Sequence, residues 1–301
     1  MPELPEVETM RRGIANAAGA RIIAAEFPRG RVRPLSIQPR PTVLGPRLAD
    51  RTIAAVQRRG KRIVLELAAT AAADTRWLVI EPRMTGLMLV TDPPSAEHVR
   101  LVLHLERARH RDAPRRILFW DRRGLGTIRL HDQAGLEAAC GPEKLGPDGL
   151  TVTGDELAKR LKASRRAVKV ALLCQRAVAG IGNIYAAEIL CRVGIDPRTR
   201  CRQLTRDAWE RIAAAARQVL AEAVRLEGSS IGDETYRTPD NRAGRFQHEH
   251  RVYGLEGTAC AACSASIVRI VQAQRATFFC PACQQRPGAR RRRVARSGRM
   301  A

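Results

Sequence analysis

Four cysteines near the end of this 301-residue chain constrain its fold more than any other feature. They form two pairs, Cys260-x2-Cys263 and Cys280-x2-Cys283. Two such knuckles joined by a hairpin are typical of a four-thiolate zinc site. The intervening segment SIVRIVQAQRATFF can supply the two strands of that hairpin. Four ligands fill a tetrahedron, so we expect one structural Zn²⁺ with no open position for water.

The rest of the chain is typical of a globular cytosolic protein. Its length suggests about two domains, and 45% hydrophobic residues are sufficient for packed cores. No apolar run reaches the roughly 18 residues of a membrane span, and the acidic N-terminus does not resemble a secretory signal. We therefore expect buried thiols, without metal or disulfides, at the four unpaired cysteines Cys140, Cys174, Cys191 and Cys201.

The charge balance favours a polyanionic partner. Lys and Arg number 53 against 30 Asp and Glu, a formal net charge of +23. Such a surplus attracts phosphate backbones without reading their sequence. A genome rich in G and C would also favour Arg, but it would not suppress acids to this extent, so nucleic acid is the preferred interpretation.

Hydrophobic periodicity divides the chain into an α+β architecture. Val7, Met10 and Ile14 have helical spacing, which predicts a helix over 4–19. From 20 to 131, eight short alternating or apolar runs without intervening helices predict a β-sandwich. Helical patterns follow, ending in a long helix after Thr205, and a polar stretch over 227–245 is interpreted as a mobile loop. We predict a helix and sandwich domain over 1–135, a helical domain over 150–250, a zinc-finger hairpin over 251–285 and a disordered basic tail over 286–301.

Two further patterns are compatible with phosphate binding. In AGIGNIYAAE, Gly180 and Gly182 precede a helix that should begin near Asn183, where unpaired amides can hold a phosphate. The same pattern also occurs in ordinary interhelical turns. Arg275, in AQRATFF between the cysteine pairs, could bind a phosphate in a forked manner, although an arginine in a basic protein is more often simply solvated.

The opening sequence MPELPEVET offers a nucleophile. Once Met1 is removed, Pro2 presents a secondary amine whose pKa near 8 leaves a free-base fraction at neutral pH. Its attack on a carbonyl-equivalent carbon would give an iminium ion. Glu3 and Glu6 lie close enough in sequence to move protons or orient the amine. On the residues alone, the ordinary explanation carries more weight, because Met-Pro starts are common and acids favour helix N-termini.

These motifs together resemble the formamidopyrimidine-DNA glycosylase and endonuclease VIII family of base-excision repair enzymes. MPELPEVET, QRRGKR, GIGNIYAAE and the CAAC to CPAC hairpin containing AQRATF occur in the family's order, over residues 1 to about 283. PELPEVE resembles the formamidopyrimidine branch, which implies 8-oxoguanine and ring-opened purines as substrates. The resemblance also implies a helix-two-turn-helix element containing Asn183, damaged double-stranded DNA as partner, a monomer, and the bacterial cytosol or nucleoid as location.

The resemblance assigns roles to matched positions. Pro2 would attack the sugar C1′ and form a Schiff base, Glu3 would be the general acid at the sugar ring oxygen, and Glu6 would assist proton transfer. Successive β- and δ-elimination would then leave a one-nucleotide gap. Lys61 is placed with these catalytic residues and would also grip a phosphate. The implied DNA-binding residues are Met84, Arg123, Leu125, Lys169, Asn183 and Arg275, and a loop around 229–246 would cover the extruded base.

Two departures from the family pattern concern lesion recognition. Glu81 stands where the family has a phosphate-contacting histidine, and an acid there would repel a phosphate unless Arg83 compensates. Leu125 replaces an aromatic wedge; leucine can intercalate, but it stacks less well on bases. These changes favour as an alternative a noncatalytic or lyase-only binder of damaged DNA, or a glycosylase with shifted lesion specificity. A zinc-ribbon RNA-binding protein would explain the charge and cysteines but not the opening motif.

Overall fold

Helix α1 (Leu4–Gly13) begins immediately after the residues of the opening motif. The computed structural model describes residues 2–28, 33–68, 74–106, 112–232 and 236–287. Pro5 suits the first turn of α1, and the Glu6 carboxylate accepts a hydrogen bond from the backbone N–H of Glu3 at 2.8 Å. The helical spacing seen in the sequence buries Val7, Met10 and Ile14. The helix ends at Gly13, and a 3-10 turn (Ala15–Ala17) follows.

Two sheets form the expected β-sandwich, and α1 packs at its edge. The four-stranded sheet has the order β1 (Ile22–Glu26), β7 (Val99–Leu105), β8 (Arg116–Asp121) and β6 (Gly86–Leu89). The five-stranded sheet has the order β2 (Ser36–Gln38), β9 (Thr127–His131), β5 (Arg76–Glu81), β4 (Arg62–Ala68) and β3 (Thr52–Arg59). All pairs are antiparallel except β2 with β9. Apolar side chains from both sheets and α1 form one core.

The expectation of strands alone between 20 and 131 is wrong in one respect. Helix α2 (Pro41–Leu48) intervenes, and it buries only Leu44 and Leu48. Gly45 and Pro46 inside it hid its periodicity. After β9, helix α3 (Gln133–Cys140) is capped by Asp132 and packs on β5 and β9, so it belongs structurally with the sandwich.

The second half is helical. It contains α4 (Gly154–Leu161), α5 (Val168–Leu172), α6 (Asn183–Arg192) and α7 (Arg206–Arg225). The apolar face of α7, which includes Trp209, Ile212 and Val219, is buried, and the helix contacts α4, α6 and α1. Trp209 and Tyr185 are the largest side chains of this helical core. None of the helices in the described ranges is long and apolar enough to cross a membrane.

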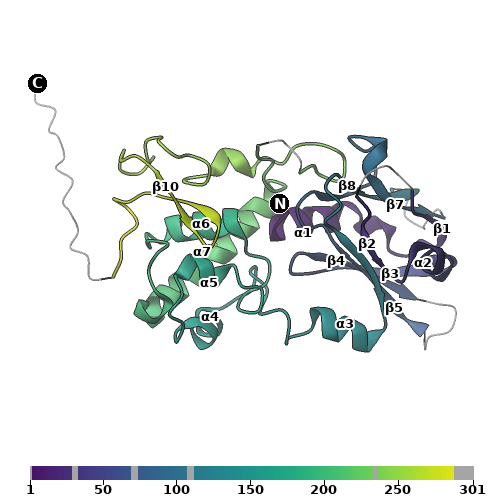
Figure 1. The fold of residues 1–301 in the computed structure, drawn as a ribbon, viewed down its shortest axis with the longest axis horizontal. Coiled ribbons are helices and arrows are strands. Elements are labelled where there is room, and N and C mark those ends of the chain that lie inside the picture. The colour runs from purple at the N-terminus through teal and green to yellow at the C-terminus, as the bar shows by residue number, and fades with distance from the viewer. Residues whose placement is uncertain (1, 29–32, 69–73, 107–111, 233–235, 288–301) are drawn as a thin grey trace, which may run out of the picture.

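A zinc-finger hairpin closes the described chain. Strands β10 (Val268–Gln272) and β11 (Arg275–Phe279) pair antiparallel, as expected from the sequence between the cysteine pairs. Ala273 and Gln274 form the two-residue turn with φ values of 46° and 61°, the left-handed conformation that such hairpins require. The turn places Arg275 at the start of β11. Figure 1 shows the hairpin beside α6, with α1 between the helical half and the sandwich. The tail from residue 288 lies outside the described residues.

Buried ion pairs join the two halves. The guanidinium of Arg58, on β3, contacts the Glu8 carboxylate of α1 at 3.0 Å. It also contacts Asp148, which precedes the helical domain, at 2.7 Å. Only 9% of the Arg58 side chain is exposed, so both contacts are shielded from solvent. Arg58 therefore connects the first helix, the sheet and the segment that leads into the second domain.

Candidate active site and zinc centre

The opening motif lies against the start of α6. Pro2 and Glu3 are buried, and the next residue, Leu4, donates its N–H to the carbonyl of Gly180 at 3.0 Å. Oε1 of Glu3 accepts a hydrogen bond from the backbone N–H of Ile184 at 3.0 Å, in the first turn of α6. The second oxygen, Oε2, is buried and has no hydrogen-bond partner among the described residues. One carboxylate oxygen is thus anchored, and the other is available to a reacting group.

Glycines are required for this close approach. A Cβ on Gly182 would lie 2.2 Å from the Glu3 carboxyl carbon. Gly180 has a φ of +97°, and a Cβ there would lie 2.4 Å from the side chain of Leu4. The GIG sequence therefore lets the N-terminal segment lie directly on the α6 turn. The glycines therefore make room for the N-terminal segment, whereas the sequence alone suggested that they bind a phosphate.

Glu6 is fully buried and accepts three hydrogen bonds. Its donors are the backbone N–H of Glu3 at 2.8 Å, the backbone N–H of Ser229 at 2.9 Å and the Tyr185 hydroxyl at 2.5 Å. Burial raises the pKa of Glu6, the nearby charge of Glu3 raises it further, and these hydrogen bonds partly oppose the rise. A carboxyl with a raised pKa is suited to accept and return protons.

Four cationic or amide side chains form a group near Glu3: those of Lys61, Lys169, Asn183 and Arg275. Lys169 is buried, and its ammonium donates to Asn183 Oδ1 at 2.6 Å and to Thr277 at 2.7 Å. The Asn183 amide in turn donates to the carbonyl of Ala276 at 3.0 Å, while Arg275 is exposed. Burial lowers the pKa of Lys169 to about 8.

Lys61, in the turn between β3 and β4, belongs to the same group. Burial lowers its pKa, while the charges of Glu3 and Glu6 raise it and Arg275 lowers it. Lys61 is therefore within electrostatic range of Glu3, Glu6 and Arg275.

Two turns carry Met84, Arg123 and Leu125, three of the residues expected to bind DNA. Met84 and Leu125 are partly exposed, and Arg123 is exposed. The buried carboxylate of Asp121 organises both turns. It accepts hydrogen bonds from the Thr85 hydroxyl at 2.5 Å, from the Arg123 N–H at 3.2 Å and from the Gly126 N–H at 2.8 Å. The two turns are therefore held as one rigid edge of the sandwich.

Glu81, the acid expected to repel a phosphate, is neutralised locally. Its carboxylate contacts Arg62 at 3.4 Å and Arg83 at 3.2 Å. Arg83 has a φ of 56°, and its side chain remains 55% exposed. Compensation by Arg83, which the sequence left open, is thus present in the structure, and Arg62 adds to it.

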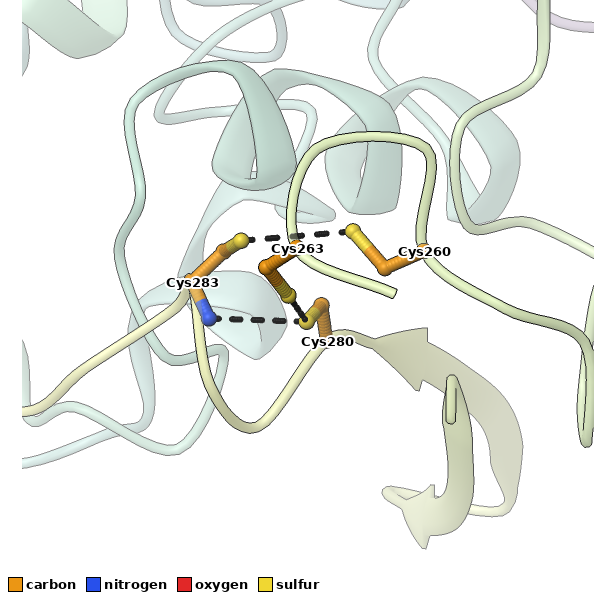
Figure 2. Close-up of side chains that lie close together, drawn as sticks. All are labelled: Cys260, Cys263, Cys280 and Cys283. Atoms are coloured by element: carbon orange, nitrogen blue, oxygen red, sulfur yellow. Dashed lines mark hydrogen bonds between the residues drawn. The ribbon is translucent and has the colours of Figure 1, made fainter. Parts of the chain in front are cut away.

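The four cysteines of the two knuckles converge. Figure 2 shows Cys260 facing Cys283 and Cys263 facing Cys280, with Sγ to Sγ distances of 3.9 and 3.4 Å. All four sulfurs lie within 4.8 Å of one another. A tetrahedral zinc with Zn–S bonds of about 2.3 Å separates its sulfurs by about 3.8 Å, so the group fits the ion. Cys140, Cys174, Cys191 and Cys201 lie outside the cluster.

Sequence reasoning missed several residues that organise the site. Tyr185 and Glu188 lie within the GIGNIYAAE motif, but helical periodicity identified them only as part of a helix. Glu188 is buried and accepts backbone N–H groups of Arg251 and Tyr253 at 2.9 Å each. It thereby docks the segment leading to the zinc knuckles onto α6. A glutamate inside an apolar helix was the available signal.

The loop after Ser229 is packed against the site in its described part. Ser229 and Ser230 are buried, and the Ser230 hydroxyl donates to the carbonyl of Tyr236 at 2.7 Å. It also accepts the N–H of Gly244 at 3.0 Å. Residues 233–235 lie outside the described residues, so the expectations of mobility and of base covering stay predictions.

Three family models match successive parts of the chain. The formamidopyrimidine-DNA glycosylase N-terminal domain matches residues 1–128, and the H2TH domain of the same enzymes matches residues 144–235. A zinc finger found in FPG and IleRS matches residues 257–286. The order agrees with the sandwich, helical and hairpin parts of the fold.

Relatives and solved structures match over nearly the full length. A formamidopyrimidine-DNA glycosylase of Chloroflexus aggregans is 41% identical, covering 94% of this chain and 98% of the relative. One from Cereibacter sphaeroides is 38% identical, covering 95% and 100%. The crystal structure of the MutM (Fpg) protein of Thermus thermophilus superposes with a TM-score of 0.79 at 37% identity, covering 94% and 98%. The Lactococcus lactis Fpg in complex with abasic-site DNA has a TM-score of 0.79 at 30% identity, covering 94% and 99%.

Proposed function

The chain belongs to the formamidopyrimidine-DNA glycosylase family, and we propose that it excises oxidised purines from double-stranded DNA through an N-terminal proline. The activity of this family is that of a DNA glycosylase and abasic-site lyase of base excision repair. The observation that carries the proposal is the contact of the opening motif with α6, which buries Pro2 and Glu3 beside Lys61 and Lys169. The proposed substrates are 8-oxoguanine and formamidopyrimidines.

In the proposed mechanism, the Pro2 amine, free after removal of Met1, attacks the sugar C1′ of the damaged nucleotide. A bond forms from nitrogen to C1′, the glycosidic bond breaks, and the base leaves with its electrons. Oε2 of Glu3, buried and without a partner among the described residues, protonates the sugar ring oxygen as the ring opens. Glu6 takes the proton that the amine loses, and the iminium that results promotes β- and then δ-elimination.

The polar group beside Glu3 would hold the DNA backbone. Arg275 is exposed and suits a forked contact with a phosphate. The Asn183 amide donates to the carbonyl of the adjacent Ala276, and Lys61 is within electrostatic range of Arg275. Lys169 is a positioning residue in this proposal, since its ammonium is buried and directed at Asn183 and Thr277. The nucleotide must leave the stack, because C1′ is inaccessible within a duplex.

Met84, Arg123 and Leu125 would fill the space that the extruded base leaves. The hydrogen bonds of Asp121 support this role, since they link the two turns that carry these three residues, all of them at least partly exposed. Leucine inserts without stacking as an aromatic ring would. This substitution favours one second candidate function, an enzyme that processes abasic sites efficiently but selects a different lesion from 8-oxoguanine.

Zinc would be held by Cys260, Cys263, Cys280 and Cys283, and its role is structural. Bound there, the ion crosslinks the two knuckles and fixes the hairpin that carries Arg275. The bacterial origin of the relatives supports action on the nucleoid in the bacterial cytosol. We further propose that one chain suffices, because the proposed catalytic and zinc-binding residues come from a single copy.

Borohydride trapping tests the proposal. Protein lacking Met1 is incubated with a duplex carrying 8-oxoguanine opposite cytosine, and in parallel with an abasic-site duplex. A covalent adduct on both is expected. Pro2→Gly, and a form that keeps an N-terminal extension, should lose the adduct while retaining DNA binding.

An adduct on the abasic duplex alone would support the second candidate function. Absence of any adduct with the unmodified protein would refute the glycosylase and lyase mechanism, as would normal turnover by Pro2→Gly.

A further inference from the structure

We propose that Glu6 exchanges protons with solvent through a relay formed by Tyr185, Ser229 and His250. The inference rests on the proposed function, because it assigns a route to the proton that Glu6 receives during attack. Glu6 is fully buried, so the proton needs a path out of the site. His250 is partly exposed and forms the outer end of that path.

The hydroxyl groups connect in sequence. The Tyr185 hydroxyl lies 2.5 Å from Glu6 Oε1 and 3.5 Å from Ser229 Oγ. Ser229 Oγ lies 3.1 Å from Nε2 of His250. The backbone N–H of Ser229 also binds Glu6 Oε1 at 2.9 Å, which keeps the serine beside the carboxylate. Every intermediate member can both accept and donate a proton.

Aromatic neighbours orient the His250 ring. The imidazole lies edge-on to Phe246 and Tyr253, with ring centroids 5.6 and 5.8 Å away. Nε2 of the ring lies against Ser229 Oγ. The relay uses the tautomer in which Nε2 accepts the Ser229 hydroxyl.

Charged neighbours tune the protonation of the ring. Burial lowers the pKa of His250, while Glu188 of α6, the Tyr253 backbone and Glu3 raise it, and His248 lowers it. A neutral imidazole at physiological pH can accept a proton at Nε2 and then release one to water.

The proton steps balance. Attack by Pro2 transfers the amine proton to Glu6. Glu6 then protonates the Tyr185 oxygen as Tyr185 gives its own proton to Ser229, and Ser229 gives its proton to Nε2 of His250. The imidazolium loses a proton to water. Glu6 is again a carboxylate, both hydroxyl groups are restored, and no oxidant or other reactant is consumed.

His250→Asn tests the relay, because an amide keeps polarity at this position but does not titrate. Multiple-turnover base excision, in which Glu6 must lose its proton between cycles, is measured between pH 5 and 9, together with the DNA dissociation constant and the melting temperature. The matched control is His248→Asn, which removes an exposed histidine on the same segment. Ser229→Ala and Ser229→Thr form a second pair, since only threonine retains the hydroxyl.

We expect His250→Asn to slow excision about tenfold, less than the roughly 100-fold or more supplied by a direct acid or base. Wild-type activity should fall at acidic pH as both the Pro2 amine and His250 become charged, and the part of this fall that comes from His250 should disappear in the variant. His248→Asn should retain it. Imidazole added to His250→Ala should restore part of the excision rate. Ser229→Thr should excise faster than Ser229→Ala. The DNA affinity of all these variants should be unchanged.

A His250→Asn rate and pH profile identical to wild type would overturn the relay. So would a loss that is equal at every pH and is not relieved by imidazole in His250→Ala, since that pattern indicates packing alone. Failure of the proposed function is distinguishable, because the wild-type protein itself would then give no borohydride adduct.

Discussion

The carboxylate of Glu3 accepts a hydrogen bond from the N–H of Ile184 at 3.0 Å, although the two residues are 181 positions apart. The bond attaches the N-terminal segment to the first turn of α6, where helix amides are otherwise unpaired. Because the contact needs close backbone approach, the glycine before α6 is the position at which a small change should have the largest effect.

Gly182→Ala should separate Glu3 from α6. The added Cβ would lie 2.2 Å from the Glu3 carboxyl carbon, so the carboxylate has to move. We expect single-turnover excision to fall about 100-fold, comparable to the loss of a general acid, while zinc content is unchanged. Gly45→Ala in α2 is the control, since its nearest contact would be 3.3 Å. Wild-type excision by Gly182→Ala would contradict the role given to Glu3.

Arg58→Met should weaken the connection between the two halves. It leaves the buried Glu8 carboxylate, and also Asp148, without this partner. We expect the free energy of unfolding to fall by about 2 kcal/mol, as for the loss of hydrogen bonds between charged groups, because Glu8 keeps Arg11 and Arg12 as partners. Arg59→Met is a matched control, because Arg59 makes a single 3.7 Å pair with Glu137, and such pairs contribute about 0 to 1 kcal/mol. Urea denaturation measures both; equal losses would contradict the special role of Arg58.

Lys169 should make stability depend on pH. Burial lowers its pKa to about 8 in the folded protein, whereas an unfolded lysine titrates near 10.4. Between these values the unfolded chain binds the proton more strongly, so the free energy of unfolding should rise with pH, by about 2 to 3 kcal/mol from pH 7.5 to 10. Well below pH 8 this contribution is constant, because the lysine is then protonated in both states.

The rise should be absent in Lys169→Met and present in Lys162→Met, an exposed control on the same domain. Urea denaturation at several pH values gives the comparison. Parallel curves for wild type and Lys169→Met would show that the buried ammonium does not titrate in this window.

Glu81→Gln should strengthen DNA binding. The substitution releases Arg62 and Arg83 from their shared acid and raises the net charge by one. If either arginine then meets a phosphate, the slope of log affinity against log salt should steepen by about 1. Glu26→Gln, at an exposed acid of the sandwich, makes the same charge change as a control. Identical slopes for both variants would place Glu81 away from the DNA.

Cys280→Ser should remove the zinc and the function of the hairpin. The thiolate is one of four converging sulfurs, and three ligands hold zinc less tightly. We expect zinc content to drop from one per chain to none, and DNA affinity to fall about tenfold as Arg275 loses its support. Cys174→Ser, outside the cluster, should keep both values. Full DNA affinity without zinc would contradict this prediction.

The sequence by itself determined features that depend on local spacing. The Cys-x2-Cys pairs predicted the zinc site, residue periodicity predicted α1, α7 and most strands, and ordered motifs identified the family. Helix α2 was not predicted, because Gly45 and Pro46 obscure its periodicity and it buries only two leucines. Local patterns carry this information because helices, strands and metal knuckles are each formed within a few residues.

Only the tertiary structure decided which distant groups meet. Several contacts of the site join separate elements. Gly182 leaves room for Glu3, Glu6 accepts three hydrogen bonds, Lys169 is buried, and Glu81 pairs with two arginines. No period or spacing encodes them. Burial and neighbouring charge set the protonation of Glu6 and Lys169, and both are properties of the packed molecule rather than of the residues in sequence.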